Sequence, residues 1–198
     1  MKHKLAIIQS ILFALAVTPS ALCSTESGNP PPPISYTPPS GWSMQAVPGF
    51  EYKFAMGPAI NDFRPNINVV AENYSGSLES YMTQAKQMLG KVLSDKLSII
   101  SEAEFVTDTG LRGIKMVFVA GHDLDEGHRD SLAKLGAPKE VKDLLAAAKI
   151  EPKTLYQSSY VFSDGSKVYT VTCTAPLEAK AEMSPLFDTA VKSFALSK

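Results

Sequence analysis

The stretch GHDLDEGHRD, residues 121–130, is the densest group of chemically active side chains in the sequence. Imidazole nitrogens and carboxylate oxygens are ligands that suit zinc or manganese. One interpretation of this stretch is therefore a metal site, used for metal binding or for metal-dependent catalysis. The side chains that could act as ligands are His122, Asp123, Asp125, Glu126 and His128.

The spacing favours a solvated loop over a metal site. The two histidines do not form HExxH, in which an i, i+4 spacing places both on one helical face, and an EF-hand would need a different alternation and a distal glutamate. Gly121 and Gly127 make the segment flexible, so ligands would not be held in place. We therefore predict no metal ligand here and keep the metal site as the alternative.

Other kinds of catalytic site find no support in the sequence. There is no GxSxG motif, and Gly110 and Gly113 fall in a predicted hairpin rather than in a phosphate-binding loop. Cys173 lies in an alternating apolar run, which predicts a small buried side chain rather than a nucleophile. We predict no catalytic residue, no cofactor-binding residue and no enzyme activity.

The amino-acid composition is typical of a globular protein. Its 198 residues are 44% hydrophobic and 20% charged, which is enough apolar material for one sizeable core. The net charge is −1, whereas nucleic-acid-binding proteins usually carry a basic stripe. We therefore expect one domain and no nucleic acid as a partner.

Residues 1–23 have the pattern of a secretory signal peptide. Lys2 and Lys4 precede an apolar run from Leu5 to Val17, which is shorter than the roughly 20 residues needed to span a bilayer. We predict simple cleavage after Cys23, and hence a periplasmic or extracellular protein. The alternative is a lipoprotein acylated at Cys23, which would anchor the chain to a membrane. The mass of the exported protein distinguishes the two.

Residues 24–40 are rich in proline and small polar residues, which predicts a stiff, extended tether. The domain is expected to follow from 41 to 198. Its predicted elements are strands at 42–56, 66–74, 97–107, 111–121, 155–163 and 166–175, with a helix from 78 to 93.

The end of the domain is predicted to be a second helix, capped by Ser184 and with Pro185 at its first position. Residues 122–154 interrupt the strands and form a helical insert, with a helix expected over 138–150. Strands paired as hairpins, together with amphipathic helices, predict an α+β domain in which an antiparallel sheet is flanked by helices.

Several short segments resemble the PsbP family. They are the Gly41-Trp42 start, PNINVV, GSLESY, FVTDTG, YVFSDGSKVYTVT and FDTAVKSF. DcrB-type periplasmic proteins and Ran-binding Mog proteins share that fold, and the resemblance covers roughly residues 41–198. It implies a PsbP-like α/β/α sandwich and a non-enzymatic binding or assembly module, and it carries over no catalytic motif.

We therefore expect an exported, non-enzymatic accessory protein of the cell envelope that docks a protein partner. The insert at 122–154 is the expected contact surface, because loops on a rigid scaffold often carry function. The rival hypothesis is a metal-binding protein or a metal-dependent enzyme that uses the loop at 122–128.

Overall fold

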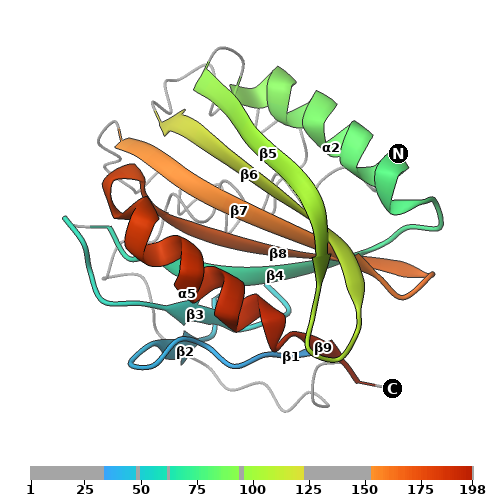
Figure 1. Ribbon diagram of the computed structural model, residues 1–198, viewed down its shortest axis with the longest axis horizontal. Coiled ribbons are helices and arrows are strands. Elements are labelled where there is room, and N and C mark those ends of the chain that lie inside the picture. Colours follow the sequence, from blue (N-terminus) through green and yellow to red (C-terminus); the bar gives the residue numbers. More distant parts are fainter. Residues whose placement is uncertain (1–33, 48–49, 62, 94–95, 123–152, 198) are drawn as a thin grey trace.

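The computed structural model describes residues 34–47, 50–61, 63–93, 96–122 and 153–197 (Figure 1). Within these ranges the main element is a seven-stranded antiparallel sheet with the order β2-β3-β4-β8-β7-β6-β5. Its strands are β2 (Ser43–Gln45), β3 (Phe54–Met56), β4 (Asn66–Asn73), β5 (Leu97–Val106), β6 (Arg112–His122), β7 (Lys153–Ser163) and β8 (Lys167–Pro176).

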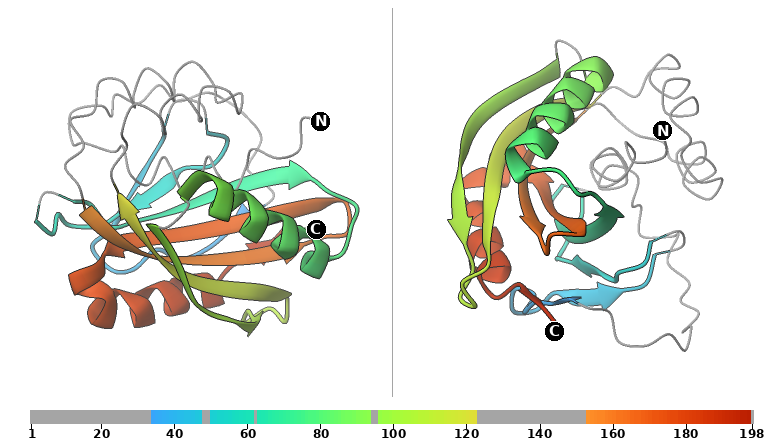
Figure 2. Two further views of the ribbon diagram at one scale, coloured as in Figure 1. Left: turned by 90° about the horizontal axis from the view of Figure 1, so that it is seen from above. Right: turned by 90° about the vertical axis from the view of Figure 1, so that its right-hand side faces the viewer.

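Two helices cover opposite faces of this sheet (Figure 2). Helix α2 spans Leu78–Leu93, and helix α5 spans Lys180–Lys192 directly after the short 3-10 helix η3, Leu177–Ala179. Because successive side chains on a strand point to opposite faces, each helix packs against alternate residues of the same strands. The expected α+β architecture, an antiparallel sheet between helices, is confirmed.

Each face has its own apolar core. On one face Met82 and Leu89 of α2 lie in a cluster with Phe118 of β6. On the other face Phe187 of α5 lies in a cluster with Tyr156 of β7. The predicted helix at 78–93 and both long hairpins are therefore confirmed, and each is held in place by burial of its apolar side.

The last helix begins earlier than the sequence indicated. It starts at Lys180, so Ser184 is not its cap and Pro185 lies inside it. A proline at this depth removes one backbone hydrogen bond of the helix. The early start follows from η3, which runs directly into α5, and from Met183, which is buried against the sheet.

Part of the predicted tether belongs to the folded domain. Residues Ile34–Ser35 form strand β1, which pairs antiparallel with β9, Ala195–Leu196. The Ile34 side chain is buried, and the backbone N–H of Thr37 donates to Ser193 Oγ at 2.7 Å. The folded part thus extends to at least Ile34. The predicted signal peptide and most of the helical insert lie outside the described residues.

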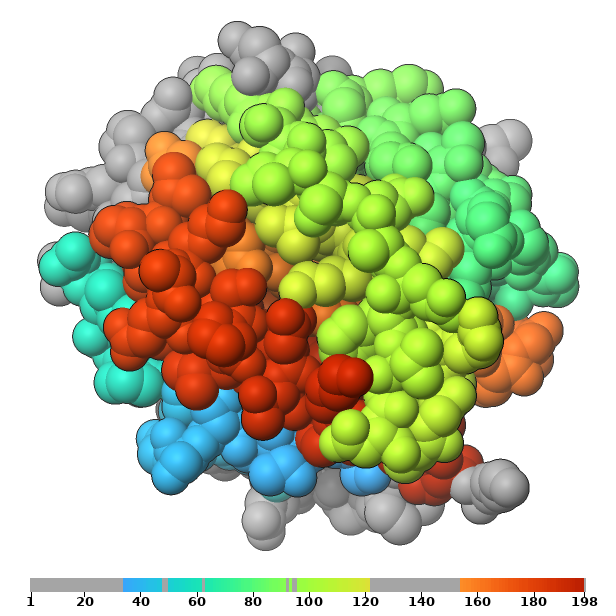
Figure 3. All heavy atoms as spheres, viewed as in Figure 1, coloured from blue at the N-terminus to red at the C-terminus, as the bar shows by residue number. Residues whose placement is uncertain are grey.

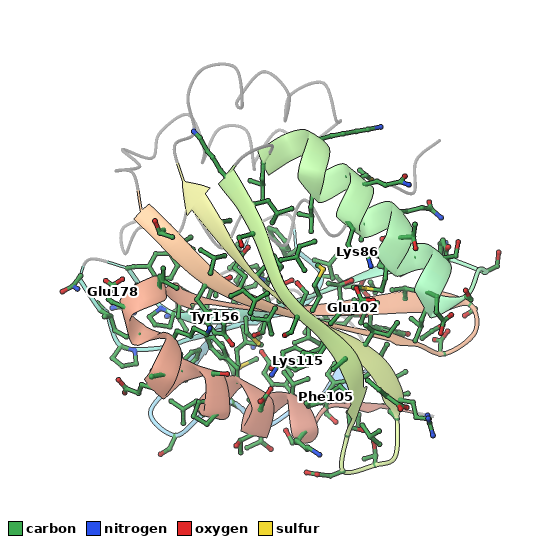
Figure 4. All side chains as sticks on the ribbon, turned by 45° about the horizontal axis from the view of Figure 1, so that its top comes forward. Lys86, Glu102, Phe105, Lys115, Tyr156 and Glu178 are labelled. Carbon is green, nitrogen blue, oxygen red and sulfur yellow. The ribbon has the colours of Figure 1, made fainter. Side chains whose placement is uncertain are left out.

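Asp188 connects α5 to the sheet through a salt bridge and a hydrogen bond. Lys115 of β6 and Tyr160 of β7 both contact Asp188 Oδ1 of α5, each at 2.5 Å. On the other face Lys86 of α2 pairs with Glu102 of β5 at 2.9 Å (Figure 4, which labels Lys86, Glu102 and Lys115). Both helices are therefore fixed to the sheet by polar as well as apolar contacts.

The β7–β8 turn is organised by Asp164, as its Asp-Gly sequence predicted. Gly165 has a φ of +94°, in the region that favours glycine. Asp164 Oδ1 accepts hydrogen bonds from the backbone N–H groups of Lys167 and Ser166, at 2.7 and 2.8 Å. These hydrogen bonds lower the pKa of the Asp164 carboxyl to about 2.

We expect Asp164→Asn to lower the free energy of unfolding by about 1 kcal/mol at pH 7, because the carboxylate is exposed and solvent screens much of its effect. A pKa below the ordinary value means that the ionised group stabilises the fold above about pH 4 and loses that effect as pH falls towards 2. Urea unfolding at pH 7 and near pH 2 measures this. Asp108→Asn, in the other hairpin turn, is the control. A difference that persists near pH 2 would contradict the assignment.

Candidate functional site

A cleft of about 470 Å³ opens on the α5 side of the molecule. It is formed where three segments adjoin: the start of the domain, the β3–β4 connection, and η3 with the first turns of α5. Figure 3 shows these segments side by side in blue, teal and orange-red. The lining residues are Ser40, Gly41, Trp42, Pro58, Ile60, Pro65, Glu178, Ala179, Glu182, Met183 and Leu186.

The indole of Trp42 is held rigidly in this cleft. Its ring meets the ring of Phe187 edge-on, with centroids 6.1 Å apart. A Cβ on Gly57 would lie only 2.7 Å from the indole, so the ring packs directly against the backbone at Gly57. The chain enters through Gly41, whose φ is +79°. A fixed aromatic surface of this kind can contact a ligand without loss of side-chain entropy.

Two carboxylates give the cleft a negative charge. Glu178 lies in η3, and Asn61 Nδ2 donates to its Oε1 at 3.2 Å. Glu182 lies in the first turn of α5, where a carboxylate is favoured by the helix dipole. Among the described residues that line the cleft there is no lysine, arginine or histidine. The cleft therefore suits a cationic group that also has apolar surface.

The polar side chains that line the cleft are few. Its described lining holds one hydroxyl side chain, Ser40, the two carboxylates of Glu178 and Glu182, and neither cysteine nor histidine. Cys173, the other nucleophile considered from the sequence, is fully buried in the α5-side core, and burial raises the pKa of its thiol well above the ordinary value. Its predicted role as a small core residue is confirmed.

The histidine-rich loop falls largely outside the described residues. His122 is the last residue of β6, paired in register with Lys153, while Asp123, Asp125, Glu126 and His128 are not described. Within the described ranges no three His, Cys, Asp or Glu side chains gather as a metal site would require. The metal site stays an untested alternative.

Sequence reasoning missed the cleft because its parts are distant in the chain. In the sequence Trp42 marks only the expected start of the domain, and Glu178 follows it 136 positions later. The one local signal was a lone tryptophan beside a glycine at a domain edge. Glu178 and Glu182 do not indicate a binding site in the sequence, because exposed glutamates near a helix start are common.

Comparison with known proteins finds similar folds among solved structures only. No family model matches the chain, and no curated protein matches it. Among solved structures, LpqN of Mycobacterium tuberculosis, described as involved in cell envelope biogenesis, is similar at 12% identity with a TM-score of 0.56, covering 88% of this chain and 89% of that one.

Two further solved structures are similar to the chain. A Pseudomonas aeruginosa protein of unknown function, described as a putative regulator, matches at 7% identity with a TM-score of 0.52, covering 83% of this chain and 98% of that one. Cyanobacterial PsbP from Synechocystis sp. PCC 6803 matches at 11% identity with a TM-score of 0.49, covering 87% and 98%.

No helix in the described ranges has both the length and the apolar character needed to cross a bilayer.

At sequence identities of 7–12%, the matches to solved structures establish the fold and no shared activity. The antiparallel sheet with a helix on each face, expected from the sequence, is the fold of this chain, and the LpqN and Pseudomonas aeruginosa structures share it.

Proposed function

We propose that this chain is an exported, non-enzymatic binding protein of the cell envelope, which docks a basic segment of a protein partner in the Trp42 cleft. The observation that carries the proposal is the composition of the cleft: a fixed indole and two carboxylates, with no basic side chain among its described lining residues.

The chemistry of the cleft selects the kind of partner. A lysine or arginine side chain combines a cation with an apolar stem, so it can contact Trp42 and a carboxylate at once. Leu186 is 37% exposed at the rim and offers apolar surface to residues flanking that cation. A volume of about 470 Å³ fits a few residues of an extended segment rather than a folded domain.

Location in the envelope is supported by the signal-like residues 1–23 and by the similarity to LpqN, a protein involved in cell envelope biogenesis. Periplasmic delivery follows if cleavage occurs after Cys23, and membrane attachment follows if that cysteine is acylated. In both cases the cleft belongs to the part of the chain that would be exported.

The fluorescence of Trp42 provides the test, because Trp42 is the only tryptophan in the chain. We expect a short Lys- and Arg-containing peptide to change the emission saturably, and an acidic peptide of matched length to have no effect. Glu178→Gln combined with Glu182→Gln should weaken binding at least tenfold at low salt, and added salt should weaken binding to the parent protein.

A matched control is Glu104→Gln combined with Glu102→Gln, which removes two carboxylates of β5 outside the cleft and should leave peptide affinity unchanged. Equal affinity for basic and acidic peptides would contradict the proposal. So would full affinity in the Glu178/Glu182 variant.

A further inference from the structure

Two carboxylates lie one helical turn apart on one wall of the Trp42 cleft (Figure 4, which labels Glu178). Glu178 belongs to η3 and Glu182 to the first turn of α5, and both side chains are exposed. The chain passes from η3 into α5 without interruption, so residues four positions apart lie on the same side of the helix. The cleft therefore offers two adjacent acceptor groups rather than a single negative charge.

Asn61 orients the first of these carboxylates. Its side-chain Nδ2 donates to Glu178 Oε1 at 3.2 Å. Asn61 has a φ of +45°, in the left-handed region that asparagine adopts more readily than most residues with a side chain. It lies in a turn with two backbone hydrogen bonds between Ile60 and Phe63, at 2.7 and 2.9 Å. The β3–β4 connection thus orients a carboxylate that belongs to η3.

The indole of Trp42 gives the same cleft a flat wall. Its six-membered ring packs against Gly57, and Phe187 meets the indole at an interplanar angle of 90°. Pro58 and Pro65, whose rings restrict the backbone, also line the cleft. The exposed part of the indole is therefore a planar surface with a fixed orientation, and it lies in the same cleft as the two carboxylates.

Given the proposed docking of a basic segment, on which this inference rests, we propose that the cleft selects arginine over lysine and that Asn61 is a positioning residue for that selection. A guanidinium is planar, so it stacks on an aromatic face, and its five N–H groups lie in one plane from which they reach two acceptors. A flat indole beside two adjacent carboxylates is the complement of that group.

Lysine fits the same surroundings less well. Its ammonium is compact and strongly hydrated, and its three N–H groups diverge, so it cannot stack flat on the indole while it donates to both carboxylates. One carboxylate in any orientation satisfies it. The difference in affinity between the two side chains therefore depends on whether both carboxylates stay in position, and the Asn61 amide helps to hold Glu178 there.

The role of Asn61 differs from that of a residue that contacts the ligand, because Asn61 is not among the described residues that line the cleft. Without the Asn61 amide, Glu178 loses a contact that orients it, and the ligand has to order the carboxylate itself. Ordering a flexible side chain on binding costs free energy. That cost falls mainly on arginine, which uses both carboxylates, so the ratio of arginine affinity to lysine affinity should fall.

Three peptides of one sequence test the selection. They carry arginine, lysine or citrulline at a single position and no other basic residue, and citrulline keeps the planar shape of arginine without its charge. Binding to the parent protein is followed by Trp42 fluorescence and by calorimetry. We expect the arginine peptide to bind at least tenfold more tightly than the lysine peptide and at least tenfold more tightly than the citrulline peptide.

Asn61→Gly tests the positioning role, because glycine adopts the left-handed φ and only the side chain is lost. We expect the affinity for the arginine peptide to fall at least fivefold, while the affinity for the lysine peptide changes less than twofold. Asn73→Gly is the matched control. Asn73 is an exposed asparagine at the end of β4, outside the described lining of the cleft, so both affinities should stay unchanged.

Equal affinities of the parent protein for the arginine and lysine peptides would overturn the selection and leave the docking of basic segments in place. An arginine-to-lysine ratio that is unchanged in Asn61→Gly would overturn the role of Asn61, and this includes the case in which both affinities fall together through a purely structural effect. If neither basic peptide binds, or if the citrulline peptide binds as tightly as the arginine peptide, the proposed function itself fails and the selection fails with it.

Discussion

Replacement of Phe187 by alanine is expected to lower the free energy of unfolding by about 3–5 kcal/mol. The Phe187 side chain is fully buried on the inner side of α5. Its ring stacks on Tyr156 with centroids 6.3 Å apart and meets Trp42 edge-on (Figure 4, which labels Tyr156). The substitution therefore leaves a cavity at the point where α5, the sheet and the domain start meet.

The same substitution should alter the cleft. Without the Phe187 ring, the indole of Trp42 keeps its contact with Gly57 but loses its support from α5. We expect the emission maximum of Trp42 to move to longer wavelength in the folded variant and basic peptides to bind more weakly. Urea unfolding followed by circular dichroism and by fluorescence measures both effects.

Leu186→Ala is the matched control for stability. Leu186 precedes Phe187 in the same helix but is 37% exposed, so its truncation should cost less than about 1 kcal/mol. A Phe187→Ala variant that is as stable as Leu186→Ala would show that α5 does not hold the domain in the way the structure indicates.

The regular elements could be predicted because each is specified by its own residues. The helix at 78–93 follows from its apolar period, and the Asp164-Gly165 turn follows from a side chain that bonds its own backbone. The start of α5 could not be predicted. Ser184-Pro185 is a strong local signal for a helix start, and burial of Met183 four residues into the helix outweighs it.

The Trp42 cleft could not be predicted from local sequence. The Trp42 cleft joins residues far apart in the chain, through the pairing of β1 with β9 and the turn into α5. The burial of Asn66, Thr174 and Gln157 could not be predicted either, because Asn, Gln and Thr are ordinary residues for the solvated face of a strand. Only the strand register and the burial of that face show that these side chains lie together and out of water.

The pairing of β6 with β7 predicts a second large effect of a substitution on stability, at Gly113. Gly113 of β6 lies opposite Phe162 of β7. A Cβ on Gly113 would lie 2.5 Å from the carbonyl oxygen of Val161 and equally close to the Phe162 ring. Because the nearest obstacle is partly backbone, a rotamer change cannot remove the clash.

We therefore expect Gly113→Ala to destabilise the protein by about 1–3 kcal/mol, since relief requires the two strands to shift apart. Gly90→Ala is the matched control. Gly90 lies in α2 with nothing within 4 Å of its added Cβ, so the same change there should stabilise by about 0.5–1 kcal/mol.

Thermal or urea unfolding of the two glycine variants shows directly whether each substitution raises or lowers the free energy of unfolding. If Gly113→Ala were as stable as the parent, the β6–β7 register would be wrong, and with it the placement of Phe118 beside Gln157 and of Met116 beside Ser159. A destabilised Gly113→Ala together with a stabilised Gly90→Ala would establish that register, because the steric conflict arises only when Gly113 faces Phe162.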